Sequence, residues 1–158
     1  MDITQLFARK LGFGAMRLPG ADKKNIDYPQ VCDMVDMFLE RGFNYFDTAF
    51  VYAGSEDALR NCLTSRHSRD SYLLTDKLPP WNRRSFADYQ KAMETSLKRC
   101  GVDYFDIYLM HNMGKPTYPQ VQAAGGFDFL AKAKADGKAR YNGFSFHDSP
   151  EYLEQILC

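Results

Sequence analysis

The chain has 158 residues, 45% of them hydrophobic, and this length and composition fit one globular domain with a buried core. Its 20 basic and 20 acidic residues cancel, so no overall field favours nucleic acid or an anionic membrane surface as a partner. No apolar run is long enough to span a bilayer, which predicts no membrane partner either.

The N-terminus and the cysteines both favour a cytoplasmic location. Residues Met1 to Gln5 lack the basic start and apolar run of a signal peptide. The four cysteines are widely spaced and form no Cys-x-x-Cys pair. We therefore predict that Cys32, Cys62 and Cys100 lie in helices as buried reduced thiols, and we expect neither a disulfide nor a metal site.

Predicted strands and helices alternate along the chain. Residues 11–18 form a short apolar run that predicts the first strand, and Pro19-Gly20 ends it. Asp27, with Gln30 three residues later, matches a capping box and starts the first helix, which ends at Gly42. Further strands are predicted at residues 43–46, 72–75, 104–110 and 139–144, and further helices start at Ser55, Ser85, Phe127 and Ser149.

This order predicts an α/β fold with parallel strands joined by right-handed crossovers. An open doubly wound sheet and a (β/α)8 TIM barrel both fit the alternation. Polar groups at the C-terminal ends of several strands favour the barrel. A complete barrel needs about 250 residues, so the prediction is a barrel truncated to about the first four and a half β/α units, with residues 1–158 as a single partial domain.

Four polar residues fall at or just beyond these predicted strand ends: Asp47, Tyr52, Lys77 and His111. Each one alone is more often ordinary, as a turn cap, a surface aromatic, a solvated lysine or a turn residue. Together they occupy one rim of a parallel sheet, because the C-terminal ends of its strands meet there. The Gly12-x-Gly14 pair is a weak sign of dinucleotide binding, since the third glycine and an adjoining helix are missing.

The four side chains predict a specific chemistry. A phenol ionises near pH 10 in water, and a neighbouring ammonium group stabilises the phenolate. A carboxylate keeps that ammonium charged and in place, and an imidazole orients a carbonyl oxygen by a hydrogen bond. Such a group protonates a carbonyl oxygen while a hydride arrives at the carbon. The hydride has to come from a cofactor, because no side chain supplies one.

The sequence resembles the aldo-keto reductase superfamily over nearly its whole length. The matching motifs are Leu11-Gly-Phe-Gly-Ala-Met-Arg-Leu-Pro19, Asn44-Tyr-Phe-Asp-Thr-Ala49 with Tyr52, Gly54-Ser55-Glu56, Thr75-Asp-Lys77, Asp103-Tyr-Phe-Asp-Ile-Tyr-Leu-Met-His-Asn112, Gly137-Lys-Ala-Arg140 and Gly143-Phe-Ser-Phe-His147. The resemblance implies that Asp47, Tyr52, Lys77 and His111 form a catalytic tetrad. It also implies NADPH as hydride donor and a small aldehyde or ketone as substrate.

Further residues take their expected roles from the same resemblance. Gly14, Ala15, Met16 and Ser145 are expected beside the nicotinamide end of NADP(H), together with Asp47. Trp81 and His111 are expected to contact the substrate, although Trp81 fits equally well as a loop aromatic covering the barrel edge. The Ser-Phe-His-Asp sequence at residues 145–148 resembles a microbial branch whose members often carry a C-terminal iron–sulfur segment, and these 158 residues contain no such segment.

The resemblance covers the N-terminal portion of the family's barrel. In relatives the later strands hold most of the cofactor, so two other functions stay open at this point: a non-catalytic binding or regulatory subunit, and a truncated gene product without activity. Open sheet edges also predict self-association through unpaired strands.

Overall fold

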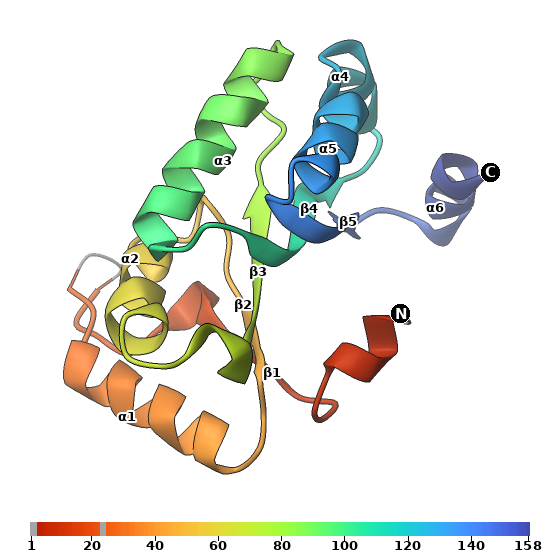
Figure 1. The fold of residues 1–158 in the computed structure, drawn as a ribbon. Coiled ribbons are helices and arrows are strands. Elements are labelled where there is room, and N and C mark those ends of the chain that lie inside the picture. Colours follow the sequence, from red (N-terminus) through yellow and green to blue (C-terminus); the bar gives the residue numbers. More distant parts are fainter. Residues whose placement is uncertain (1–2, 23–24) are drawn as a thin grey trace.

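The computed structural model describes residues 3–22 and 25–158, and Met1 and Asp2 of the N-terminal stretch considered above lie outside them. Its centre is a parallel sheet in which five strands follow one another in chain order (Figure 1). Helices α1, α2, α3 and α5 lie along one side of this sheet. Because right-handed crossovers between neighbouring strands keep these connecting helices on one face, this is the wall of a barrel and not a doubly wound sheet.

The first two strands are short. β1 (Gly12–Gly14) ends in a 3-10 turn, η2 (Ala15–Arg17), so the predicted strand over residues 11–18 is too long. β2 (Tyr45–Asp47) pairs with β1 in register, placing Gly14 beside Asp47. A short 3-10 helix, η1 (Ile3–Leu6), precedes β1. Because both strands are short, the loops that follow them begin close to the rim formed by the C-terminal ends of the strands.

The next two strands are longer than predicted. β3 (Leu73–Leu78) contains Lys77, and all six of its residues are buried. β4 (Phe105–Met113) extends past His111. The polar residues of these strands therefore lie inside regular structure and not in the loops that follow. One face of each strand packs against helices and the other faces the barrel interior. Such a strand can therefore continue past its polar residues.

Asp27 and Ser85 cap helices as predicted, whereas Ser55 lies at the predicted helix start but does not cap the helix. The Asp27 carboxylate accepts a hydrogen bond from the Gln30 amide at 3.1 Å and starts α1 (Tyr28–Glu40), and Ser85 likewise caps α3 (Phe86–Cys100). α2 (Ser55–Leu59) instead begins after Gly54, which has the left-handed φ of 71°. Ser55 is buried and does not cap the helix. α2 continues into a π-helical turn, η3 (Arg60–Thr64).

The C-terminal part contains one helix that the sequence pattern did not predict. α4 (Tyr118–Ala123) has six residues and buries Val121, so it is too short to show helical periodicity. α5 (Gly126–Ala135), β5 (Ala139–Phe146) and α6 (Pro150–Leu157) follow, and the Ser149 hydroxyl accepts from the Tyr152 amide to cap α6. A 3-10 turn, η4 (Arg69–Ser71), precedes β3.

Aromatic and aliphatic side chains fill the space between the sheet and the helices. Phe38 of α1 contacts Phe13 and Phe46 of the first two strands, with ring centroids 5.6 and 5.2 Å apart. Tyr89 of α3 and Phe129 of α5 stack at 5.7 Å. No helix in the described residues is long and apolar enough to cross a membrane. Within residues 3–22 and 25–158, the outer edges of β1 and β5 pair with no further strand.

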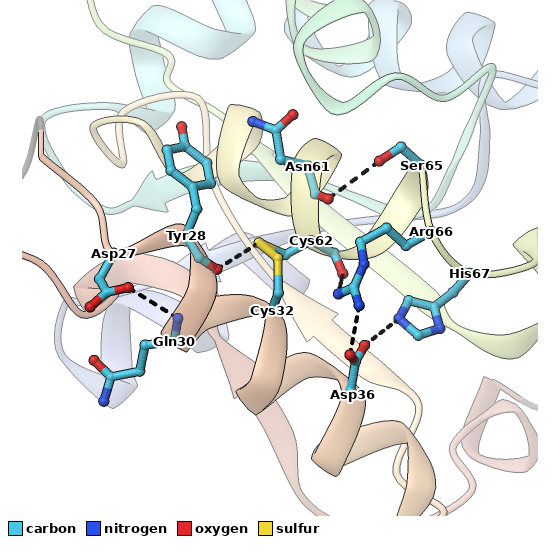
Figure 2. Close-up of a disulfide and its surroundings, with 10 residues drawn as sticks. All are labelled: Asp27, Tyr28, Gln30, Cys32, Asp36, Asn61, Cys62, Ser65, Arg66 and His67. Atoms are coloured by element: carbon cyan, nitrogen blue, oxygen red, sulfur yellow. Dashed lines mark hydrogen bonds and ion pairs between the residues drawn. A yellow bond between two sulfur atoms is a disulfide. The ribbon is translucent and has the colours of Figure 1, made fainter.

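Cys32 and Cys62 form a disulfide, which corrects the prediction that both are reduced thiols (Figure 2). Cys32 comes from α1 and Cys62 from η3, whose packing brings the two Cα atoms to 4.5 Å. Beside it, the Asp36 carboxylate accepts from Arg66 and contacts His67, each at 2.7 Å. His67 is therefore paired with a carboxylate. Cys100 is a buried free thiol as predicted, and Cys158 is exposed.

Candidate active site

Three neighbouring strands bring the candidate residues to one rim. Asp47 is the last residue of β2, Lys77 is the penultimate residue of β3, and His111 lies near the end of β4. The register pairs Asp47 with Thr75 and Lys77 with Leu109, so Lys77 and His111 each lie two positions further along their strands than the candidate residue on the preceding strand. Parallel pairing therefore places an acid, a base and an imidazole next to one another.

Lys77 is the centre of this group. Its side chain is 8% exposed, and its ammonium nitrogen contacts the Asp47 carboxylate and donates to the Thr48 carbonyl oxygen at 2.7 Å. A buried ammonium group needs such partners, because burial without them favours the neutral amine. These partners hold a positive charge at a fixed point on the rim.

Tyr52 lies on the tight loop between β2 and α2. The Thr48 and Ser55 hydroxyls are hydrogen-bonded at 2.6 Å across the base of this loop, and both residues are buried. The Tyr52 amide donates to the Ala49 carbonyl at 2.9 Å. The loop thus returns the Tyr52 ring over the strand ends, with the Lys77 ammonium 4.9 Å from the ring centroid.

His111 faces Tyr52 from the other side. The two rings meet edge to face with centroids 5.8 Å apart, and the Trp81 ring lies 5.7 Å from the imidazole. Burial, together with the charge of Lys77 and the nearby His147, lowers the pKa of His111 from 6.5 to about 4. The imidazole is therefore neutral at neutral pH, and its Nδ1 is buried with no hydrogen-bond partner in the described part of the chain.

The residues expected near the cofactor lie around this group in two places. Gly14 is beside Asp47 in the sheet, and Ala15 and Met16 follow in η2. Ser145 lies in β5, where its hydroxyl accepts from the Asn112 amide at 2.8 Å. The structure thus brings Gly14 to Asp47, and Ser145 to the residue after His111, whereas the Met16 side chain is 55% exposed.

Sequence reasoning missed two residues that shape the site. Thr48 supplies both a carbonyl oxygen to Lys77 and a hydroxyl to Ser55. Asn112 adopts the left-handed backbone conformation, with φ of 54°, directly after His111. Of these two residues, only Thr48 could have been identified from the sequence, because it follows Asp47 inside the buried Phe-Asp-Thr-Ala stretch.

Comparison with known proteins decides the family. The model of the Aldo/keto reductase family matches residues 10–158. The chain belongs to the aldo/keto reductase family. The resemblance seen in the sequence motifs is thereby confirmed.

Individual members of the family match this aldo/keto reductase in sequence and structure. An aldo-keto reductase of Mycolicibacterium smegmatis is 38% identical over 123 residues, which are 78% of this chain and 42% of that protein. A glyoxal reductase of Bacillus subtilis is 30% identical over 129 residues, 81% of this chain and 44% of that protein. A crystal structure of an aldo-keto reductase from Klebsiella pneumoniae in complex with NADPH superimposes with a TM-score of 0.73 at 26% identity, covering 92% of this chain and 48% of that one. The chain thus spans less than half the length of these relatives.

The structural match confirms the predicted fold class. The five parallel strands correspond to part of the barrel of solved aldo/keto reductases, and the chain covers about half of each. The barrel-type α/β fold predicted from the alternating strands and helices is therefore confirmed, and this chain contains part of such a barrel.

Proposed function

We propose that this aldo/keto reductase chain carries the proton-delivering part of a site that reduces aldehydes or ketones to alcohols with NADPH. The observation that carries the proposal is the position of the Lys77 ammonium between the Asp47 carboxylate, the Thr48 carbonyl and the Tyr52 ring. A fixed cation beside a phenol is the arrangement that proton donation by tyrosine requires.

Each side chain has a distinct part in this proposal. Tyr52 gives its phenolic proton to the carbonyl oxygen of the substrate. The charge of Lys77 stabilises the phenolate that remains, and Asp47 keeps the ammonium in place. His111 is neutral, and because its Nδ1 is buried, Nε2 is the nitrogen that donates a hydrogen bond to the same carbonyl oxygen. Charge that develops on the oxygen is thus stabilised from two directions.

NADP(H) is the cofactor that this chemistry requires, since it supplies the hydride. The NADPH-bound structure from Klebsiella pneumoniae supports this choice. In this chain, Gly14, Ala15, Met16 and Ser145, with Asp47, are the residues that would hold its nicotinamide end. Open space for a large flat group exists here, because a Cβ atom added at Gly14 would meet nothing within 4 Å and Met16 is exposed.

The substrate class follows from the same rim. We propose small aldehydes and ketones, with Trp81 beside His111 forming one wall of the substrate position. The Bacillus subtilis relative is named for the reduction of glyoxal, which supports a small dicarbonyl as the first test substrate.

Two measurements on the purified chain and a Tyr52→Phe variant test the proposal. We expect NADPH fluorescence titration to show binding by both proteins. We expect the parent to reduce glyoxal and Tyr52→Phe to do so at least about 100-fold more slowly, since general acid catalysis contributes about 10²–10⁴-fold. Equal rates in the two proteins would refute the role of Tyr52. Absence of NADPH binding by the parent would refute the enzymatic function and favour a non-catalytic binding role.

A further inference from the structure

We propose that Glu56, Asp76 and Cys100 form a binding site for Zn²⁺ on the helix-facing side of β3. Glu56 comes from the first turn of α2, Asp76 from β3 and Cys100 from the end of α3. One ligand atom from each residue lies within 4.8 Å of the other two, and all three residues are buried. This site is separate from the proposed reduction chemistry and does not depend on it.

The two carboxylates have oxygen atoms that the protein leaves unpaired. Asp76 Oδ1 accepts from the Lys77 amide at 2.7 Å, but Oδ2 is buried without a hydrogen-bond partner among the described residues. Glu56 Oε2 accepts from Arg99 at 3.0 Å, and Oε1 is likewise buried and unpaired within that part of the chain. Burial and the neighbouring Glu56 raise the pKa of Asp76 well above its ordinary value, so a second negative charge beside Glu56 is unfavourable here unless a cation offsets it.

Two neutral side chains supply a second, independent observation. Ser96 precedes Cys100 by one helical turn, so both face the same way from α3. Tyr108 is the direct neighbour of Asp76 across β3 and β4, so its ring lies on the same face of the sheet. Both residues are fully buried; the Tyr108 hydroxyl has no hydrogen-bond partner in residues 3–22 and 25–158, and the Ser96 hydroxyl lies near the Asp76 carboxyl group. The Tyr108 hydroxyl is therefore a buried unpaired oxygen on the same face of the sheet as Asp76.

The donor set selects the cation. One thiolate and two carboxylates suit Zn²⁺, which binds sulfur and oxygen ligands in tetrahedral geometry, whereas Mg²⁺ and Ca²⁺ take oxygen ligands. The hydroxyl of Ser96 or Tyr108 is available as the fourth ligand. The sequence predicted no metal site because the three residues share no ligand spacing, and only the packing of α2 and α3 on β3 brings them together. A bound ion would tie these three elements together directly behind Lys77.

Cobalt substitution tests the thiolate. We expect Co²⁺ added to the parent without reductant to produce a sulfur-to-cobalt charge-transfer band in the near ultraviolet. The band should be lost in Cys100→Ser and kept in Cys158→Ser, the matched control at the exposed free cysteine. A band that is absent from the parent, or that disappears with Cys158 instead, would overturn the proposal.

Zinc measurements cover the case in which Cys100→Ser does not fold. We expect the parent to retain one equivalent of Zn²⁺ after gel filtration, and X-ray absorption at the zinc edge to show one sulfur ligand with the remainder oxygen. Glu56→Gln and Asp76→Asn should each weaken Zn²⁺ binding at least about 10-fold in a chelator competition, because each removes a charged ligand. A parent that binds no zinc, or a zinc shell without sulfur, would overturn the proposal.

Discussion

The ammonium nitrogen of Lys77 lies 4.9 Å from the centroid of the Tyr52 ring. Lys77 belongs to β3, whereas Tyr52 belongs to the loop after β2, so the contact joins two consecutive β/α units. The ion pair with Asp47 fixes the lysine end of this contact, and the Thr48–Ser55 hydrogen bond fixes the tyrosine end. Local loop geometry and strand pairing therefore cooperate to form the site.

The Asp47–Lys77 pair should contribute to stability in a way that a double-mutant cycle can measure. Lys77→Met leaves the Asp47 carboxylate without its cation, and we expect it to lower the free energy of unfolding by about 2–3 kcal/mol. Asp47→Asn with Lys77→Met should lose less than the sum of the single variants, with a coupling of about 1–2 kcal/mol. Urea unfolding of the four proteins provides the measurement. Additive losses would mean that the two charges do not interact.

Much of this site could be predicted because polar residues that end apolar strands are visible in a sequence. Asp47, Lys77 and His111 each follow such a run, and parallel pairing brings them together. Other features depend on packing and leave no local pattern. Ser55 fits an N-cap by its position, yet its hydroxyl turns inward to Thr48 because the loop needs that contact. The pairing of Cys32 with Cys62 likewise depends on how α1 lies against η3.

His111 should make stability depend on pH. Its pKa is about 4 in the folded protein against 6.5 ordinarily, so between these values the unfolded chain binds more protons. Stability should therefore fall as the pH is lowered from about 6.5 to 4, by about 2 kcal/mol once partial exposure to solvent is allowed for. His111→Gln should remove most of this slope, whereas His67→Gln, at the Asp36 pair, should retain it. Unfolding curves at several pH values in this range measure both, and an unchanged slope in His111→Gln would contradict the assignment.

Asp106 should be a stabilising residue outside the candidate active site. Its buried carboxylate accepts from the Leu74 amide at 2.8 Å, from Arg69 at 2.5 Å and from Arg140 at 3.0 Å, which joins β3, β4 and β5. Asp106→Asn removes the charge that both arginines face, and we expect a loss of about 3 kcal/mol in the free energy of unfolding. Asp136→Asn is the control, because its pair with Lys132 is exposed and should contribute less than about 0.5 kcal/mol. Similar losses in the two variants would contradict the prediction.

The Cys32–Cys62 disulfide should be detectable by counting thiols. In denaturant without reductant, we expect two reactive thiols, from Cys100 and Cys158, and four after reduction. The bond closes a loop between residues separated by 30 positions. A loop of that length restricts the unfolded chain enough to stabilise the folded protein by about 3–4 kcal/mol.

The matching stability test compares the parent with and without reductant. Reduction should lower the free energy of unfolding of the parent by that amount and leave a Cys32→Ala variant unchanged, because the variant has no bond to lose. Cys158→Ser serves as the control, with one thiol fewer and the same response to reductant as the parent. Four thiols in the untreated parent would show that the two cysteines stay reduced. In that case the packing of α1 on η3 would rest on the Asp36 contacts with Arg66 and His67 and on the surrounding apolar side chains.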